Sequence, residues 1–267
     1  MKIAQDNNIP SDKFEVEWGT PNLPKEVDDV LSGGKYDLLT ITHNETSTGI
    51  TNPLEEISLV VKKYPEVIFC VDAVSSLGGV KIEVDKCGID ICLTSSQKCL
   101  ALPPGFSLCS ISEKAVEAAR KVVHRGTYFD LLQLYEHIQE NDYQYPFTAS
   151  LSHMFAMDYQ LDKILEEGLE NRFSRHVEVG NYVRNWAKDN FALFAEEKYA
   201  SNTVTCVKNT RNIDINELNE NLGEKGYIIS NGLGKLKNKT FRIGHMGEAT
   251  ISDLTELISV INKIPKL

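Results

Sequence analysis

One lysine in this chain follows a short apolar segment and could take part in covalent chemistry. Residues 89–93 are mostly apolar, residues 94–97 read Thr-Ser-Ser-Gln, and Lys98 comes next. A lysine at the end of a buried strand is either a residue whose aliphatic stem carries its amine to solvent, or a desolvated amine suited to Schiff-base chemistry. Its position alone leaves both interpretations open.

A second stretch supplies a carboxylate. Residues 67–71 form an apolar run that ends in Asp72, which is typical of a central parallel strand. Ligands of open α/β sheets bind outside the carboxyl ends of the strands, so we expect Asp72 and Lys98 to face one crevice. A lysine that forms a Schiff base and an aspartate that keeps a pyridine nitrogen protonated are the minimum set for pyridoxal phosphate. Many α/β proteins end strands in Asp, so the pair is only moderately specific.

Three segments together resemble the class V pyridoxal-phosphate aminotransferases, most closely their alanine–glyoxylate and serine–pyruvate branch. They read His-Asn-Glu-Thr-Ser-Thr-Gly at 43–49, Val-Asp-Ala-Val-Ser-Ser-Leu-Gly-Gly at 71–79 and Ser-Ser-Gln-Lys at 95–98. The resemblance covers essentially the whole chain in order. It implies the α/β fold of the type I pyridoxal-phosphate transferases, in which a large domain with a mostly parallel sheet precedes a small C-terminal α/β domain.

The resemblance gives each matching residue a role. It implies that Lys98 holds the cofactor and then, once the substrate has displaced it, moves the α-proton as general base and acid. It places Asp72 at the ring nitrogen, Thr46 on the side of the phenolic oxygen and Val74 against one face of the ring. Gln97 is the polar neighbour of the lysine. The related cysteine desulfurases have a histidine at that position, so Gln97 favours transamination over desulfuration.

Simpler interpretations of several residues stay open. Residues 46–49 can be a turn that caps the helix expected after Asn52-Pro53, and Val74 can be an ordinary core valine. We interpret Cys99, which adjoins the lysine, as a packing residue. We assign no chemistry to His43.

An arginine inside a predicted strand is the second strong signal. Arg242 stands in the segment Phe-Arg-Ile-Gly-His at 241–245. Without the resemblance, a cross-strand salt bridge is the simpler interpretation of this arginine. With it, Arg242 matches the residue that binds the substrate α-carboxylate, a task that suits a planar guanidinium with paired donors. The substrates implied are alanine or serine as amino donor and a 2-oxo acid such as glyoxylate or pyruvate as acceptor.

Residues 124–150 are polar and aromatic, as in a long surface segment. Within them, Tyr-Pro-Phe-Thr at 145–148 matches a family segment that reaches across a two-fold axis. The resemblance therefore implies that Tyr145 and Thr148 contact the cofactor phosphate of a partner subunit, so that a homodimer completes the site.

Periodicity and breakers predict the elements that carry these residues. We expect strands over 13–19, 36–42, 67–72, 80–84, 89–93, 106–111, 203–207, 227–230 and 240–244. We expect helices over 24–31, 54–64, 113–123, 150–167, 171–189, 214–226 and 252–264. The change of character near residue 148 predicts a large pyridoxal-phosphate-binding domain over 1–148, followed by a linking helix and a small domain over 149–267.

The family's large domain opens with a glycine- and serine-rich phosphate cup and a stacking aromatic residue, and we find no equivalent after Met1. We therefore expect an N-terminally incomplete large domain with an exposed sheet edge, which favours association. This leaves a rival from another class: a catalytically silent fragment, or one half of a split enzyme. A class V lyase or desulfurase is a second rival.

Charge and cysteine usage limit the partners. The formal net charge of −10 argues against nucleic acid and anionic membranes. No apolar run has the length of a membrane span, and the first residues lack a signal-peptide pattern. The six cysteines show no metal-ligand spacing and several stand inside apolar runs, so we expect free thiols, no metal and a cytoplasmic protein.

Overall fold

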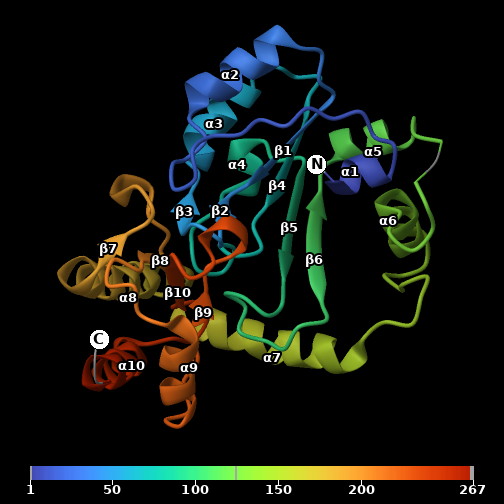
Figure 1. The fold of residues 1–267 in the computed structure, drawn as a ribbon. Helices are drawn as coiled ribbons and strands as arrows, with labels where there is room; N and C mark the ends of the chain where they lie inside the picture. Colours follow the sequence, from blue (N-terminus) through green and yellow to red (C-terminus); the bar gives the residue numbers. More distant parts are fainter. Residues whose placement is uncertain (1, 124, 265–267) are drawn as a thin grey trace.

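Two β-sheets organise the molecule, as Figure 1 shows for the computed structural model, which describes residues 2–123 and 125–264. His124, at the start of the expected surface segment, lies outside these residues. The larger sheet has the order β1 (Leu38–Thr42), β4 (Ile68–Asp72), β5 (Ile91–Ser95) and β6 (Ser107–Ile111). The first three strands are parallel and β6 runs antiparallel to β5, which confirms the mostly parallel sheet.

The smaller sheet is antiparallel throughout. Its order is β7 (Ala192–Leu193), β8 (Val204–Lys208), β10 (Thr240–Gly244) and β9 (Ser230–Asn231). Phe241 and Ile243 are buried in one hydrophobic core with residues of the helix α8 (Leu169–Asn190). Since successive side chains of a strand point to opposite faces, Arg242 between them points away from that core.

Helices accompany both sheets, although α1 (Lys2–Asp6) buries no side chain. In the larger unit they are α1, α2 (Pro24–Gly33), α3 (Leu54–Val61), α4 (Val84–Cys87), α5 (Glu113–Ala119) and α6 (Leu131–Glu140), with the short hairpin β2 (Asn44–Glu45) and β3 (Ile50–Thr51). The smaller unit has α9 (Ile215–Gly223), α10 (Ile251–Lys263) and the 3₁₀ turns η1 (Glu197–Tyr199) and η2 (Gly234–Leu236).

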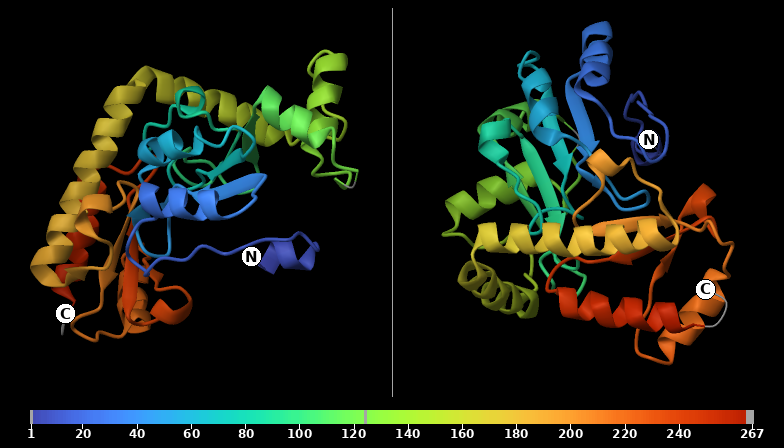
Figure 2. Two further views of the ribbon diagram at one scale, coloured as in Figure 1. Left: turned by 90° about the horizontal axis from the view of Figure 1, so that it is seen from above. Right: turned by 90° about the vertical axis from the view of Figure 1, so that its left-hand side faces the viewer.

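Two long helices, α7 (Leu151–Glu167) and α8 (Leu169–Asn190), join the sheets. Gly168, with φ +82°, separates them, so the chain turns a corner there (Figure 2). Met157 and Ile164 of α7 pack with Leu100 beside the larger sheet, whereas α8 belongs to the core of the smaller one. Across the described residues, none of the helices combines the length and the apolar character needed to cross a bilayer.

The structure corrects several predicted elements. Residues 13–19 form no strand and are largely exposed, because no neighbouring strand offers them a ladder. Residues 80–84 hold only the isolated bridge between Leu77 and Val80 and then enter α4. The segment expected to be irregular contains α6, whose first turn is capped by the Asp130 carboxylate. The Ser112 and Asp214 side chains cap the first turns of α5 and α9, and Gly168 follows the last residue of α7.

Candidate active site

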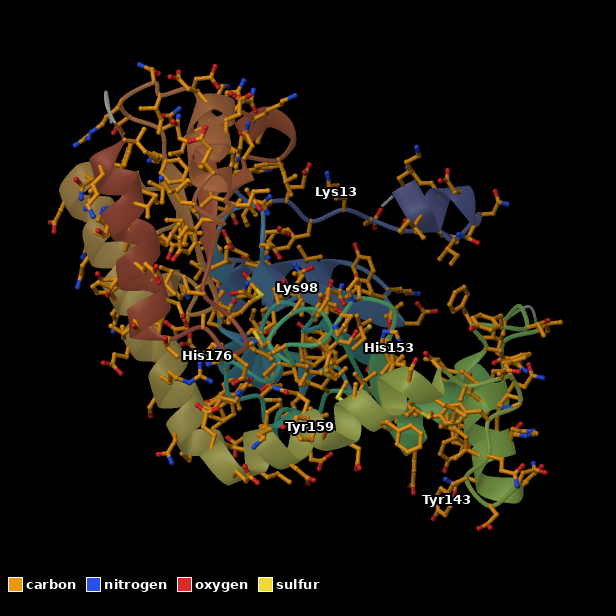
Figure 3. All side chains as sticks on the ribbon, turned by 90° about the horizontal axis from the view of Figure 1, so that it is seen from below. Lys13, Lys98, Tyr143, His153, Tyr159 and His176 are labelled. Carbon is orange, nitrogen blue, oxygen red and sulfur yellow. The ribbon has the colours of Figure 1, made fainter. Side chains whose placement is uncertain are left out.

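The carboxyl ends of β4 and β5 lie side by side and carry two of the predicted site residues. Asp72 is the last residue of β4 and pairs in register with Leu93 of β5. The chain then turns within 96–102, where the amide of Ala101 donates to the Lys98 carbonyl at 2.9 Å and that of Leu102 to the Ser96 carbonyl at 3.0 Å. Lys98 is partly buried near the middle of the molecule (Figure 3), and no described carboxylate pairs with its amine.

A pair of hydroxyls lies beside Asp72. One Asp72 carboxylate oxygen accepts from the backbone amide of Val74 at 2.9 Å, which orders the start of the loop. The next residue, Ser75, bonds through its hydroxyl to the Thr46 hydroxyl at 2.7 Å. The capping interpretation of residues 46–49 is wrong, because α3 begins after Pro53 without a side-chain cap. Val74 is partly exposed and lies outside the hydrophobic cores, so it is not an ordinary core valine.

Arg242 of the smaller sheet reaches the same region. Its Nη1 donates to the backbone carbonyl of Thr46 at 3.3 Å, and its Nε and Nη2 donate to the carbonyl of Asn231 at 3.3 and 3.1 Å. Among the described residues no carboxylate pairs with this guanidinium, so the salt-bridge interpretation is wrong. A strand-borne cation therefore lies next to Thr46 with only neutral partners.

Two serines near these groups were not singled out from the sequence. Ser75 contributes the hydroxyl that faces Thr46. The Ser95 hydroxyl, at the end of β5, is buried without a hydrogen-bond partner in the described chain. Such an orphaned polar atom calls for a water, an ion or a ligand as its partner. The signal available in the sequence was the run of hydroxyl residues directly after each apolar strand.

Two buried histidines and one cysteine near the site play structural parts. Burial lowers the pKa of His43, which bonds to Ser76 through Nδ1 at 2.9 Å, to about 4. Burial also lowers the pKa of His245, which bonds to Thr205 at 2.9 Å, to about 3. The Cys99 thiol is fully buried, and its pKa is raised to about 12, so it stays protonated and packs as expected. All six cysteines are free.

Three predicted residues lie apart from the cluster around Asp72. Gln97 is exposed on the turn before Lys98. Tyr145 and Thr148 are exposed on the segment between α6 and α7. Figure 3 shows the neighbouring Tyr143 at the far end of the molecule from Lys98. The single chain therefore does not bring Tyr145 and Thr148 to its own candidate site.

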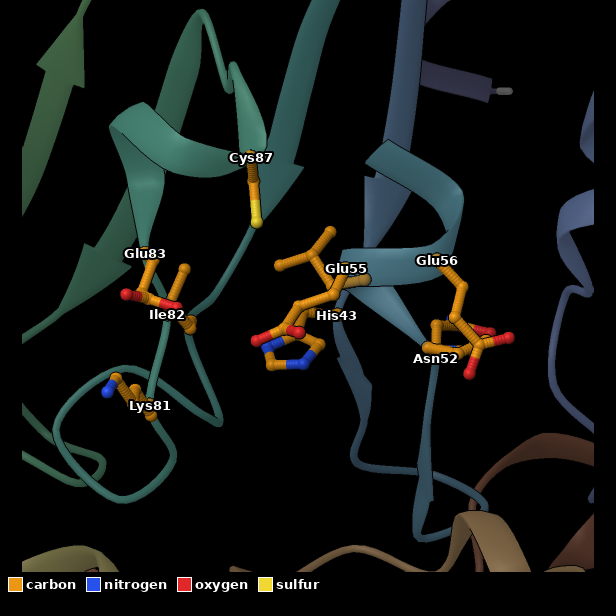
Figure 4. A pocket seen from close by; sticks show the side chains of 10 residues that line it. His43, Asn52, Glu55, Glu56, Lys81, Ile82, Glu83 and Cys87 are labelled. Atoms are coloured by element: carbon orange, nitrogen blue, oxygen red, sulfur yellow. The ribbon is translucent and has the colours of Figure 1, made fainter. Parts of the chain in front are cut away.

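A separate cavity of about 270 Å³ opens between the start of α3 and the segment 81–87 (Figure 4). Glu55, Lys81 and Glu83 line it together with His43. It contains none of Asp72, Lys98 and Arg242, so it is distinct from the candidate active site. Among the described residues no group of three His, Cys, Asp or Glu side chains is arranged to hold a metal ion.

Comparisons with known proteins agree with this geometry. The family model for class V aminotransferases matches residues 8–241. An uncharacterized aminotransferase of Methanocaldococcus jannaschii is 43% identical over 241 residues, covering 88% of this chain and 62% of the relative. The serine–glyoxylate aminotransferase of Arabidopsis thaliana is 32% identical, covering 97% of this chain and 66% of the relative.

Solved structures give the same result. The alanine–glyoxylate aminotransferase of Nostoc sp. superposes with a TM-score of 0.91 at 27% identity, covering 98% of this chain and 70% of that one. The pyridoxamine–pyruvate aminotransferase of Mesorhizobium loti gives a TM-score of 0.84 at 29% identity, covering 93% and 66%. The chain thus spans roughly two thirds of the length of these proteins.

Proposed function

This chain belongs to the class V aminotransferase family, and from that premise we propose that it serves pyridoxal-phosphate-dependent transamination of a small amino acid. Pyridoxal phosphate is the cofactor that membership of the family implies. The observation that carries the proposal is Arg242, a guanidinium held beside Thr46 by backbone carbonyls alone. A cation left without a described carboxylate partner suits the carboxylate of an amino acid.

The described side chains fit the cofactor. Asp72 uses one carboxylate oxygen for a backbone amide, and the other has no partner in the described chain. The Lys98 amine is free of ion pairs there, and the buried Ser95 hydroxyl lacks a partner. In this proposal Asp72 binds the ring nitrogen, Thr46 lies on the side of the phenolic oxygen, and Val74, beside Asp72, packs on the ring.

Once bound, the cofactor supplies an electron sink for the α-carbon of the substrate. Arg242 binds the α-carboxylate through its paired donors and so fixes the orientation of the amino acid. Lys98 would hold the cofactor through Nζ, and its amine, once free, would act as general base and then general acid toward the substrate α-proton. Gln97 lies on the turn beside this lysine.

Alanine or serine as donor and glyoxylate or pyruvate as acceptor are the proposed substrates. Relatives named for serine–glyoxylate and pyridoxamine–pyruvate transamination support small substrates. Glutamine rather than histidine before the lysine supports transamination over desulfuration. The exposed Tyr145 and Thr148 support a homodimer in which each serves the partner's cofactor phosphate.

We also propose a large domain over 1–148, and a linking helix with a small domain over 149–267. All strands of the larger sheet precede residue 148 and all strands of the smaller sheet follow it, which supports this division. Six free thiols support a reducing, cytoplasmic setting.

The test is to add pyridoxal phosphate to the purified chain and reduce the mixture with borohydride. Peptide mass spectrometry then locates the trapped cofactor. We expect labelling of Lys98 and its loss in Lys98→Ala, together with a fall of about 10⁴-fold in alanine or serine transamination. Lys81→Ala, which removes an exposed lysine paired with Glu170, is the matched control. Full turnover by Lys98→Ala without added amine contradicts the proposal.

A further inference from the structure

Arg172 of α8 is a buried cation with four hydrogen-bond partners. Its side chain is 1% exposed. Nε donates to the carbonyl of Gly78 at 2.8 Å and Nη2 to the carbonyl of Cys99 at 2.8 Å. Nη1 donates to Glu167 at 2.7 Å and Nη2 also to Glu248 at 3.0 Å. The two carboxylates compensate the buried charge, and the two carbonyls receive directed bonds.

The two carbonyls belong to the two loops that carry the candidate catalytic groups. Gly78 closes the loop that begins at Asp72, and Cys99 directly follows Lys98. A single guanidinium therefore spans the loop after β4 and the turn after β5. Because its donors are fixed in one plane, it sets the separation of the two carbonyls as a rigid spacer does.

The side chains and backbone around these two carbonyls are tightly packed. A Cβ built on Gly79 would lie 2.9 Å from the Cys99 sulfur and 2.9 Å from the His176 ring. His176 in turn bonds through Nδ1 to the Arg172 carbonyl at 2.8 Å. The loop after β4, the lysine turn and α8 are thus in direct contact on the side opposite to solvent.

The same arginine ties the lysine turn to the smaller sheet. Its partner Glu248 stands in the connection between β10 and α10 and also accepts from Gln160 at 2.7 Å. A Cβ on the neighbouring Gly247 would lie 3.4 Å from the Lys98 carbonyl. The connection that follows the strand of Arg242 therefore rests on the turn of Lys98.

We propose that Arg172 is a positioning residue that sets the placement of Lys98 relative to Asp72. The inference rests on the proposed function only for the roles of those two residues. Arg172 touches neither the substrate nor the cofactor in this account; it acts through two backbone carbonyls. A lysine in its place keeps the charge but cannot serve both loops in one plane.

Arg175 provides a matched control on the same helix. It bonds Glu167 at 2.6 and 3.0 Å and the carbonyls of Gly247 and Ala249 at 3.1 and 2.8 Å. It donates no hydrogen bond to the loop of Asp72 or to the turn of Lys98. Arg175→Lys thus perturbs the same ion-pair network without releasing the two loops.

The first measurement is amide hydrogen exchange on the full chain without cofactor. The amides of Ala101 and Leu102 report the lysine turn, since they donate to Lys98 and Ser96. We expect Arg172→Lys to speed their exchange by about tenfold and Arg175→Lys by less than about twofold. Unchanged exchange in Arg172→Lys, or equal acceleration in both variants, overturns the proposal.

The second measurement separates positioning from substrate binding. In alanine transamination, Arg172→Lys should lower kcat by about 10²-fold with little change in KM, because Arg242 binds the carboxylate. A rise in KM with kcat intact overturns the proposal. If the wild-type chain shows no transamination, the proposed function fails while the exchange measurement still decides the role of Arg172.

A second variant keeps the test informative if Arg172→Lys does not fold. Gly79→Ala retains the arginine but forces the loop away from Cys99 and His176. It should speed exchange at the same two amides. Exchange that stays at the wild-type rate in a folded Gly79→Ala variant overturns the proposal.

Discussion

The two sheets carry the side chains of the proposed site in different ways. The larger sheet delivers Asp72 at a strand end and Lys98 on a turn beyond it, whereas the smaller sheet delivers Arg242 from the middle of β10. Arg242 is held by ladders on both sides, to β8 and β9. The larger sheet's groups depend on side chains far away in sequence, such as Arg172, to fix their loops.

Because of this difference, substitutions should act differently on loop residues and on strand residues. A residue on a loop can lose its position when a different residue, one whose hydrogen bonds hold the loop, is replaced. A residue inside a strand keeps its place as long as the register holds, so its own chemistry decides the outcome. Peripheral ion pairs such as Lys63–Asp28 and Lys86–Glu83 are largely exposed and contribute little to either sheet.

Beyond the replacement of Lys98 itself, the largest effect should come from the charge at the end of β4. Asp72→Asn keeps the shape but loses the negative charge proposed to face the cofactor ring, so kcat for alanine should fall by about 10²–10³-fold. Steady-state kinetics of the purified variant measures this. Asp37→Asn, an exposed carboxyl just before β1 at the other end of the same sheet, should leave kcat within about twofold. Equal kinetics in the two variants would remove Asp72 from the site.

A smaller effect should follow from replacing Arg242, the cation carried by β10. Arg242→Lys keeps the charge but cannot bind both carboxylate oxygens in one plane, so KM for the amino acid should rise by about 10–100-fold. Arg211→Lys, whose guanidinium lies over the Phe191 ring in the same unit, is the control. A fall in kcat at constant KM would mean that Arg242 serves the chemical step, as proposed for Asp72 and Lys98, and does not serve substrate binding.

The smallest effect concerns the buried histidines. The pKa of His43 is lowered to about 4 and that of His245 to about 3, both by burial. Below the ordinary pKa of 6.5 the unfolded chain binds protons that the native state excludes. The free energy of unfolding should therefore fall as pH drops from 6.5 to 5, by at most about 1.4 kcal/mol per pH unit for each histidine.

Urea unfolding at pH 7, 6 and 5 measures this slope. His245→Asn should flatten it, since one of the buried histidines no longer titrates. An unchanged slope in that variant would show that His245 accepts a proton in the native state.

Many helices and strands were predictable because apolar runs form them, and glycine or proline ends them, through local interactions. Residues 67–72 and 240–244 become β4 and β10, and Gly168 ends α7 as predicted. The strands predicted over 13–19 and 80–84 are wrong, since alternation alone supplies no partner strand. Helix α6 was missed although its signal was present: Asp130 is a good N-cap residue, and the apolar side chains at 131, 132, 134, 135 and 138 follow helical spacing.

The sequence placed Asp72 and Lys98 in one region, because the ends of adjacent parallel strands meet at one sheet edge. The role proposed for Arg242 came from the family resemblance, since its residue type and its strand alone favoured a cross-strand salt bridge. The contact of Arg242 with Thr46 joins residues 196 positions apart in the chain, and no local pattern encodes such a pair.

Residue type and local periodicity thus determined which groups could react and which elements carry them. Tertiary structure alone decided that Arg242 has no described carboxylate partner and that Arg172 bridges two loops. In the sequence Arg172 stands among Glu167, Glu170 and Arg175, as a residue of a charged helix surface does. Its burial accompanies the corner at Gly168, after which the start of α8 lies against the loops that follow β4 and β5, and only the folded chain brings those partners together.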